Sequence, residues 1–266
     1  MGKYNKKIVQ TPSYVEIWEY EQSIFTDKKT KRTADTRPTK RRTFDELTEE
    51  EQSKRLQRMK KTRLDAKWHL LRLVDCNFDD KTSFLTLTTK ENIKARDEFK
   101  KLLKTFIKRF NYNIFKTKKS QLKYIAVLEK QKRGAWHAHM LLFDVPFIPH
   151  RQLLDLWGHG AVRVNKVDVD SKDNRGRYVT KYFEKGIGQE LLENFGKHPY
   201  LSSNNLRQPI VDKNYEPFDY DFSDTDILYE SEYSSKTYNK GEYVNSKVKY
   251  KKIKLNKKEC DWKVEK

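Results

Sequence analysis

KYIAVLEKQKRGAWHAHMLLF, residues 123–143, contains two largely apolar segments separated by a short polar turn. β-Branched and aromatic residues in both segments predict two antiparallel strands, 123–130 and 135–143. The three-residue loop Lys132–Gly134 fits a hairpin, with Gly134 in the left-handed position that such loops require. This register places Glu129 directly opposite His137.

The second strand carries two histidines that share one face. His137 and His139 are two residues apart, and strand side chains alternate between faces. Glu129 lies across from His137, with Cβ atoms roughly 5 Å apart in such pairs. Two imidazoles and one carboxylate suit a catalytic divalent cation, Mg²⁺ or Mn²⁺, and the mixed set leans towards Mn²⁺. The alternative is that both histidines are half-buried strand residues with no ligand role.

Further strands and helices alternate around this hairpin. Apolar residues at helical spacing predict helices, and alternating segments predict strands. The fold class predicted is α+β, with a central, mainly antiparallel sheet that carries the His-x-His strand and is flanked by helices. The expected elements are strand 83–89, helix 90–110, helix 149–157, strand 160–169 and helix 174–186.

The two ends of the chain differ from this central part. Residues 1–75 are expected to form a basic extension with a helix, which begins near the capping-box residues Thr43 and Thr48. Residues 76–212 form the central domain. Residues 213–266 form a second extension, in which an acidic stretch (216–233) reads as a solvated loop and the start of 247–266 as an edge strand.

Composition points to a polyanionic partner. The formal net charge is +19, which favours nucleic acid over other ligands. No segment approaches the roughly 18 apolar residues of a spanning helix, and the start has no apolar signal region, so neither a membrane partner nor secretion is expected. Cys76 and Cys260 are isolated, which favours a cytosolic chain without disulfides. No Gly-Lys-Ser or Gly-Lys-Thr motif supports an NTPase.

The stretch YVTKYFEK, residues 178–185, places two tyrosines on one helix face. Tyr178 and Tyr182 are four residues apart, and each is followed by a lysine, Lys181 or Lys185. A free tyrosine titrates near pH 10, so it needs a nearby cation to act as a nucleophile at neutral pH. The alternative is a helix that packs two rings into the core.

Taken together, these motifs resemble those of HUH endonucleases, the replication initiators of rolling-circle plasmids and phages. SFLTLTT (83–89) is similar to the first family motif, and GAWHAHMLLF (134–143) to the His-hydrophobic-His motif. YVTKYFEK is similar to the motif of the two-tyrosine class, and Glu129 matches a frequent third metal ligand. The resemblance covers roughly residues 80–210, including KHPYLSSNNLRQP (197–209).

The resemblance implies a Rep-like HUH fold and an activity. Glu129, His137 and His139 would hold the metal, and Tyr178 or Tyr182 would attack single-stranded DNA at a replication origin, including a hairpin. The products would be a 5′-phosphotyrosine and a 3′-OH primer, and the joint could later be rejoined. The implied partners are a host helicase and DNA polymerase, in the cytoplasm of a bacterial host. Candidate DNA contacts are Arg133, Arg175, Arg177, Lys104 and Lys108.

Two other functions remain open at this level. One is an HUH relaxase or transposase of a mobile element, although relaxases usually place the tyrosine before the histidines. The other is a non-catalytic nucleic-acid-binding protein with the same fold. The remaining histidines lack partners at ligand spacing and are expected to be structural or DNA-facing: His69, His150, His159 and His198.

Overall fold

The structure is a computed structural model that describes residues 2–26, 42–166, 198–214, 227–239 and 242–255. The chain divides into two compact units. One unit comprises Thr43–Arg207, and the other combines Met1–Arg42 with Gln208–Lys266.

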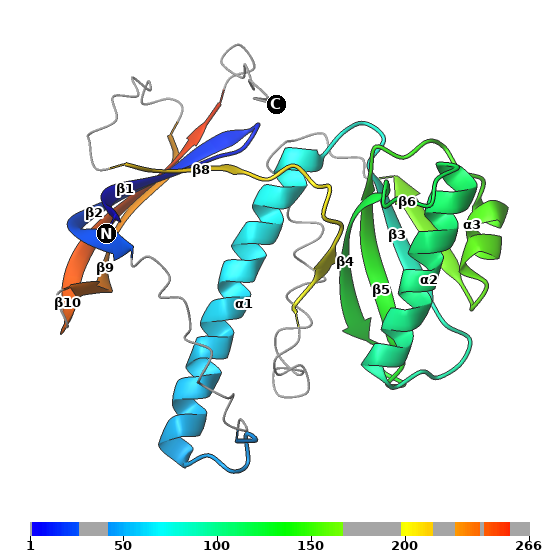
Figure 1. Ribbon diagram of the computed structural model, residues 1–266, viewed down its shortest axis with the longest axis horizontal. Coiled ribbons are helices and arrows are strands. Elements are labelled where there is room, and N and C mark those ends of the chain that lie inside the picture. The colour runs from blue at the N-terminus through cyan, green and yellow to red at the C-terminus, as the bar shows by residue number, and fades with distance from the viewer. Residues whose placement is uncertain (1, 27–41, 167–197, 215–226, 240–241, 256–266) are drawn as a thin grey trace. The chain divides into compact units, whose positions relative to one another are not determined.

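The unit Thr43–Arg207 is built on a five-stranded sheet (Figure 1). Its strand order is β6-β3-β5-β4-β7, and all four neighbouring pairs are antiparallel. The expected antiparallel sheet carrying the His-x-His strand is therefore confirmed. The strands are β3 (Ser83–Thr88), β4 (Lys123–Lys130), β5 (Trp136–Phe143), β6 (Val162–Lys166) and β7 (Leu201–Ser202).

Two helices, α2 (Arg96–Ile114) and α3 (His150–Trp157), cover one face of this sheet (Figure 1). Their apolar residues recur every three or four positions and so form one stripe on each helix. That stripe packs on the side chains that β3 and β5 direct to the same face. This cluster is the larger core, and its fully buried members include Phe99, Leu103, Phe106, Phe110, Trp157, Leu85, Leu87, Ala138 and Met140.

The helix α1 (Glu49–Asn77) covers the opposite face with its last two turns. Leu70, Leu73 and Val74 are buried there against Phe84 and Leu141, among other strand residues. The α+β prediction is thus confirmed, and a sheet with helices on both faces is consistent with a Rep-like HUH fold.

The start of α1 is set by only one of the two capping boxes in the sequence. Thr48 accepts from the backbone N–H of Glu51, and the Glu51 carboxylate accepts from the Thr48 N–H. At Thr43 only the second half of this exchange forms, with the N–H donating to Glu46 (2.7 Å). Residues 43–48 are therefore not helical, and α1 begins at Glu49.

The helix expected at 90–110 begins six residues later and extends further. The carbonyl of Ile93 accepts from the N–H of Trp136, and that of Lys94 from the Trp136 indole. Because both carbonyls accept hydrogen bonds from Trp136 of β5, they cannot accept the hydrogen bonds of a first helical turn. The helix α2 consequently begins at Arg96 and runs to Ile114.

The other unit is a second five-stranded antiparallel sheet, with strand order β8-β1-β2-β10-β9 (Figure 1). The N-terminal strands pair with strands from the C-terminal part of the chain. A small apolar cluster on one face contains Ile8, Val15, Ile17, Ile253 and Leu255. The strands are β1 (Gly2–Gln10), β2 (Tyr14–Thr26), β8 (Ile210–Asn214), β9 (Ile227–Asn239) and β10 (Glu242–Lys254).

This sheet changes three expectations about the chain ends. The basic segment expected at an edge is β10, which lies between β2 and β9. The acidic stretch expected as a solvated loop enters β9 at Ile227, where Glu230 and Glu232 face lysines of β10. The unit boundaries also differ from the expected division at residues 75 and 212, because α1 packs on the central sheet and the two chain ends pair with each other.

Among the described residues, no helix has both the length and the apolar character needed to cross a membrane.

Candidate metal centre

The hairpin between β4 and β5 has the register expected from the sequence. Glu129 pairs with His137, and the loop closes through bonds from Gln131 N–H to Ala135 O and from Gly134 N–H to Gln131 O, both 2.8 Å. Gly134 has a φ of +86°, which an L-residue rarely adopts. The glycine thus fixes the pairing that brings the carboxylate to the histidines.

The three side chains converge on one point. The Nε2 atom of His137 lies 3.2 Å from Oε2 of Glu129, and that of His139 lies 2.9 Å from the same oxygen. One ligand atom from each residue falls within 4.8 Å of the others. Their side chains are only 14%, 7% and 19% exposed for His137, His139 and Glu129. The group is therefore partly shielded from water but reachable from one side.

A neighbouring strand orients one of the histidines. Thr86 of β3 pairs with His139, and its hydroxyl lies 3.2 Å from Nδ1 of that ring. The ring of Phe84 stacks on His139 at 5.7 Å with an interplanar angle of 19°. An imidazole held through Nδ1 directs Nε2 outward, which is the usual support for a metal-binding histidine. The sequence shows both residues on one face of 83–89 but not that this strand is next to β5.

The residues present fit a divalent cation. Two imidazole nitrogens and one carboxylate oxygen are a common donor set, and three protein ligands leave positions open for a substrate. In the structure both Nε2 atoms point at the same carboxylate oxygen, so a cation between them would replace the protons of these hydrogen bonds. Glu129, His137 and His139 could therefore hold a metal ion.

Arg133, a candidate DNA contact, forms hydrogen bonds within the protein. Its guanidinium donates to the carbonyls of Thr89 and Lys90 and to Oε1 of Gln131. These bonds tie the hairpin turn to the loop that follows β3. Arg133 therefore supports the relative position of the two strands that carry Thr86 and the histidines.

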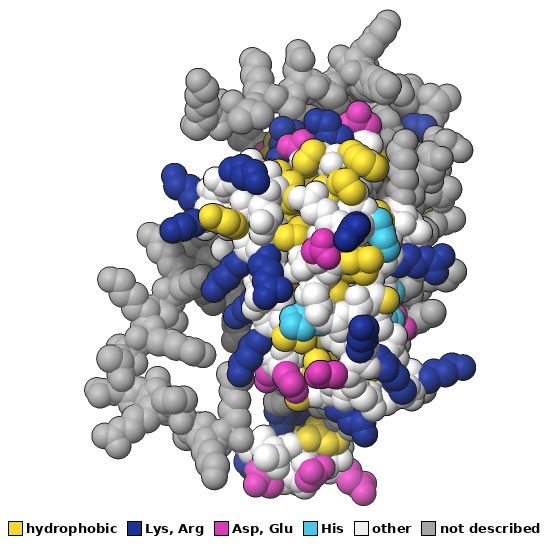
Figure 2. Space-filling view, turned by 90° about the vertical axis from the view of Figure 1, so that its right-hand side faces the viewer, with side chains coloured by type: hydrophobic (Ala, Val, Ile, Leu, Met, Phe, Trp, Pro, Cys, Tyr) yellow, Lys and Arg dark blue, Asp and Glu magenta, His cyan; other side chains and the backbone are white. Residues whose placement is uncertain are grey.

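The other sequence-derived site residues fall into two groups. Lys104 and Lys108 lie on α2 and are exposed, on the side away from its buried stripe. Lysine and arginine side chains are spread over the face shown in Figure 2. The remaining residues lie outside the described ranges: Arg175, Arg177, Tyr178, Lys181, Tyr182 and Lys185.

Three of the remaining histidines, His69, His150 and His198, lie outside the metal centre in different surroundings. The Nε2 of His150 lies 2.8 Å from the carbonyl oxygen of Val162, which joins α3 to β6. Burial and the nearby Arg72 lower the pKa of His69. The carbonyl of His198 accepts from Arg96 at 2.9 Å. The side-chain contact of His150 supports a structural role for that residue, whereas the contact of His198 is made by its backbone and its side chain is exposed.

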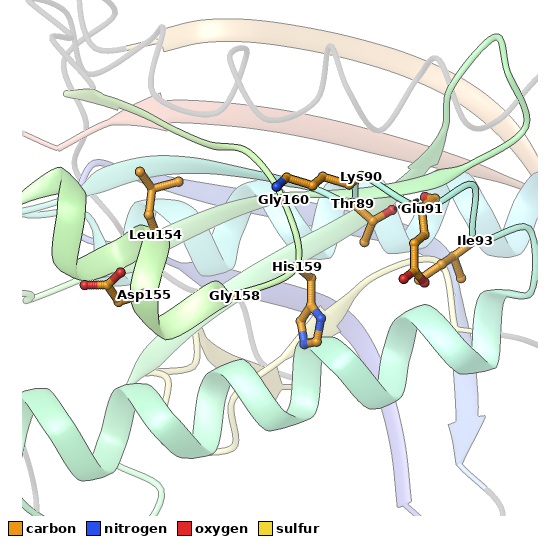
Figure 3. A pocket seen from close by; sticks show the side chains of 9 residues that line it. All are labelled: Thr89, Lys90, Glu91, Ile93, Leu154, Asp155, Gly158, His159 and Gly160. Atoms are coloured by element: carbon orange, nitrogen blue, oxygen red, sulfur yellow. Dashed lines mark hydrogen bonds between the residues drawn. The ribbon is translucent and has the colours of Figure 1, made fainter.

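His159 lines a pocket of about 330 Å³ between α3 and the loop after β3 (Figure 3). Its ring packs edge-on against Trp157, with centroids 5.2 Å apart. Gly160, which also lines the pocket, lies so close to β3 that a Cβ there would be 2.4 Å from Thr88 O. The other lining residues are Thr89, Lys90, Glu91, Ile93, Leu154, Asp155 and Gly158.

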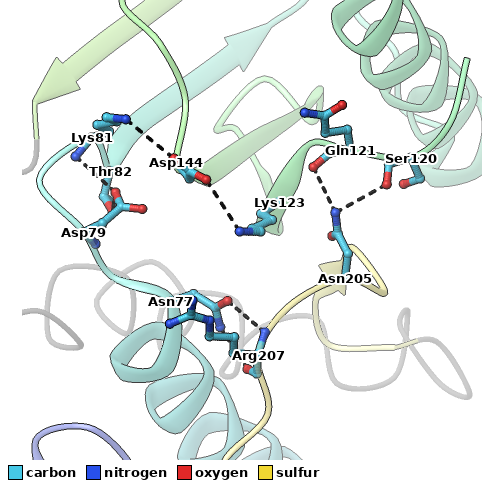
Figure 4. A network of polar contacts seen from close by, with 10 residues as sticks. All are labelled: Asn77, Asp79, Lys81, Thr82, Ser120, Gln121, Lys123, Asp144, Asn205 and Arg207. Carbon is cyan, nitrogen blue, oxygen red and sulfur yellow. Dashed lines mark hydrogen bonds and ion pairs between the residues drawn. The ribbon is translucent and has the colours of Figure 1, made fainter. Parts of the chain in front are cut away.

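The segment after the tyrosine motif is fastened to the sheet by polar contacts (Figure 4). The amide of Asn205 donates to the carbonyls of Ser120 and Gln121. The side chain of Asn77 exchanges two 2.9 Å bonds with the backbone of Arg207. Residues 203–207 are thus held against α1 and the start of β4.

Cys76 has no features of a reactive thiol. It is a free, buried cysteine on α1, and burial raises its pKa to about 12. It is therefore protonated at neutral pH. Cys260 lies outside the described residues.

Comparison with known proteins gives one match, to a family model. Residues 82–187 match the family Replication-associated protein ORF2/G2P. No curated protein and no solved structure matches the chain. The matched range begins at β3 and includes all three candidate metal ligands and the tyrosine motif. The match supports a replication initiator protein of the Rep type.

Proposed function

We propose that this protein starts rolling-circle replication by nicking and rejoining single-stranded DNA at a replication origin. Glu129, His137 and His139 hold a divalent cation, Mg²⁺ or Mn²⁺, and Tyr178 and Tyr182 are the nucleophiles. The convergence of the three ligand atoms within 4.8 Å is the observation that carries the proposal. The family match over residues 82–187 supports it independently.

The protein contributes a preorganised binding face. Glu129 and His137 are fixed by the hairpin, and His139 by Thr86 and Phe84. When bound, the cation would polarise the scissile phosphate. The mostly buried setting of the three side chains strengthens electrostatic interactions relative to bulk water, because fewer water molecules screen them.

The reaction replaces one ester bond with another. A tyrosine oxygen attacks the phosphorus and loses its proton, and the bond from phosphorus to the 3′ oxygen breaks. That oxygen takes a proton and becomes the 3′-OH primer, while the 5′ phosphate stays on the tyrosine. Lys181 lies between the tyrosines in sequence and favours the phenolate, and Lys185 assists or binds phosphate. Rejoining reverses these steps without a nucleotide cofactor.

The topology is compatible with tyrosines that serve this site. The described chain leaves the sheet at β6, on one edge, and returns at β7, on the other edge. The strands β5 and β4, which carry the three ligands, lie between these edges. Residues that follow the tyrosine motif are held beside the start of β4, the strand that also carries Glu129.

The partners follow from the reaction and from the charge. A chain with a net charge of +19 attracts the phosphate backbone, and the exposed Lys104 and Lys108 are candidate contacts, with Arg175 and Arg177 near the tyrosines. The origin strand, including a hairpin, is the substrate. A host helicase unwinds it and a host DNA polymerase extends the 3′-OH, in the cytoplasm of a bacterial host.

A covalent-adduct assay tests the proposal. The protein is incubated with Mn²⁺ and tiled single strands of the replicon that encodes it, and the products are separated on a denaturing gel. We expect one strand to yield a shorter 3′-OH product and a protein–DNA adduct of equal amount. The double variant Tyr178→Phe/Tyr182→Phe keeps both rings and loses both products.

Single variants then assign the nucleophiles. If both tyrosines act, each single variant retains cleavage but fails to complete a cycle of cutting and rejoining. Loss of all cleavage in Tyr182→Phe with full turnover in Tyr178→Phe contradicts the two-nucleophile mechanism. Absence of cleavage and adduct with every strand of the replicon contradicts the enzyme itself.

A further inference from the structure

The sheet formed by the two chain ends segregates its side chains by type. Lys213, Lys7, Trp18 and Tyr250 follow one another across β8, β1, β2 and β10 in paired positions. They therefore share one face, which we call the aromatic–lysine face. The apolar cluster around Ile17 lies on the other face, because neighbouring residues along a strand alternate. The aromatic rings are thus separate from the main apolar cluster of this sheet.

The rings and lysines on this face are in contact. The Nζ of Lys7 lies 4.8 Å from the centroid of the Trp18 ring, and the Trp18 and Tyr250 rings are 5.1 Å apart. Tyr229 of β9 continues the row at 5.9 Å from Tyr250. The result is a run of aromatic surface with cations along one side.

A second row repeats this arrangement. The Nζ of Lys213 lies 5.1 Å from the Tyr4 ring, which packs edge-on against Tyr20 at 5.9 Å. Tyr233 of β9 is 45% exposed, and Tyr229 is 57% exposed. Water therefore reaches the aromatic surface, and a planar ligand could lie on it.

Acidic side chains gather on the opposite face. Glu19, Glu230 and Glu232 form ion pairs there with lysines of β1 and β10. Among the described residues that neighbour the rings on the aromatic–lysine face, the acidic one is Glu16. It is 4% exposed, and its carboxylate accepts from the Tyr250 hydroxyl at 2.8 Å. The exposed charge next to the rings is consequently positive.

We propose that the aromatic–lysine face binds single-stranded DNA, with bases stacked on the rings and phosphates near Lys7 and Lys213. Unpaired bases expose the π-faces that stack on aromatic side chains, and a basic border tracks the backbone. The proposal rests on the proposed function, because a nicking enzyme must hold an unpaired strand. It adds a second DNA-binding surface, on a unit that contains none of the three metal ligands.

A binding measurement with matched variants tests the rings. The full chain is titrated into a fluorescent oligothymidylate of about 20 nucleotides in EDTA, and anisotropy gives the affinity. Tyr229→Ser lowers the affinity about five- to a hundred-fold, because one stacking contact is lost. Tyr229→Phe keeps the ring and the affinity. Tyr243→Ser removes a 74% exposed tyrosine from the opposite face and leaves the affinity unchanged.

The salt dependence of binding tests the lysines. Each phosphate contact to a single strand contributes about −0.7 to the slope of log affinity against log salt. Lys7→Gln/Lys213→Gln therefore makes the slope shallower by about 1.4, twice that value. Lys249→Gln, on the opposite face, leaves the slope as in the wild type.

These results separate this surface from the nicking chemistry. Wild-type affinity in both Tyr229→Ser and Lys7→Gln/Lys213→Gln overturns the inference, as does equal affinity for a duplex of the same length. Oligothymidylate binding that depends on these residues, in a protein that nicks no replicon strand, supports this surface and removes the proposed function instead. If the protein nicks a replicon strand but its oligothymidylate affinity does not depend on these residues, the proposed function is supported and this surface is overturned.

Discussion

The two five-stranded sheets of this protein use the same antiparallel architecture for different purposes. The sheet β6-β3-β5-β4-β7 has helices on both faces, and three polar ligands are placed among buried strand residues. The sheet β8-β1-β2-β10-β9 has one small apolar cluster, with ion pairs and partly exposed rings elsewhere. The first sheet can hold a few atoms in fixed positions. The second presents rings and charged side chains over a broad surface.

The largest expected effect is the loss of a core ring from the first sheet. Phe106 is 1% exposed and packs edge-on against both Phe110 and Trp157. Phe106→Ala should lower the free energy of unfolding of this unit by about 3–5 kcal/mol, through lost burial and the cavity that remains. Hydrogen exchange measured peptide by peptide should show faster opening of β5 and unchanged opening of β10. Equal acceleration in both sheets contradicts the division into two units.

Two glycines of the first unit, Gly160 and Gly134, differ in how much space surrounds them. A Cβ at Gly160 meets the backbone oxygen of Thr88 at 2.4 Å, whereas one at Gly134 meets only the Lys94 side chain at 3.8 Å. Gly160→Ala should therefore cost about 1–3 kcal/mol beyond the roughly 1 kcal/mol of left-handed strain expected for Gly134→Ala. Urea unfolding of both variants measures the difference. Equal destabilisation by the two variants indicates that the backbone around Thr88 moves to accommodate the added methyl group.

Removal of the Thr86 hydroxyl tests how the candidate metal ligand His139 is positioned. Thr86→Val keeps the shape of the side chain but removes the contact to Nδ1 of His139. Metal affinity should fall about 10- to 100-fold with little change in fold. Thr88→Val, one pair further along the same face beside His137, is the matched control. Equal Mn²⁺ affinities in calorimetric titrations of the two variants mean that Thr86 has no orienting role.

The smallest expected effect concerns an ion pair of the second sheet. The Nζ of Lys251 lies 3.0 Å from Glu230, and the side chains are 38% and 50% exposed. Solvent screens such pairs, so Glu230→Gln should change the free energy of unfolding by less than about 1 kcal/mol. The difference should shrink further in 1 M salt. A larger loss that persists in high salt implies that this sheet depends on its surface charges.

Local sequence signals predicted the hairpin and its ligands. Gly134 fixes a three-residue loop, and that loop alone determines that Glu129 faces His137. The fold class followed from the alternation of apolar periods. Thr86 was missed because its role depends on β3 pairing with β5, which are separated by α2 and β4 in the chain. No local signal in the sequence specifies that neighbour.

The second sheet was missed for a related reason. The pairs of β1 with β8 and of β2 with β10 join residues that are 200–240 positions apart, so the strands acquire partners only in the folded chain. The sequence predicted a basic extension with a helix for residues 1–75 and a solvated loop for the acidic stretch 216–233. In the structure such charges pair across strands, as Lys6 does with Glu19. The tyrosine motif lies outside the described residues, and its role remains a prediction.

The most direct test of the central claim is an Mn²⁺ titration followed by electron paramagnetic resonance. If Glu129, His137 and His139 form the metal centre, the wild type binds one Mn²⁺ per chain. His139→Ala and Glu129→Gln should lose this binding, whereas Thr88→Val keeps it. Undiminished Mn²⁺ binding in His139→Ala and Glu129→Gln, or none in the wild type, would contradict the assignment of this face as the metal centre.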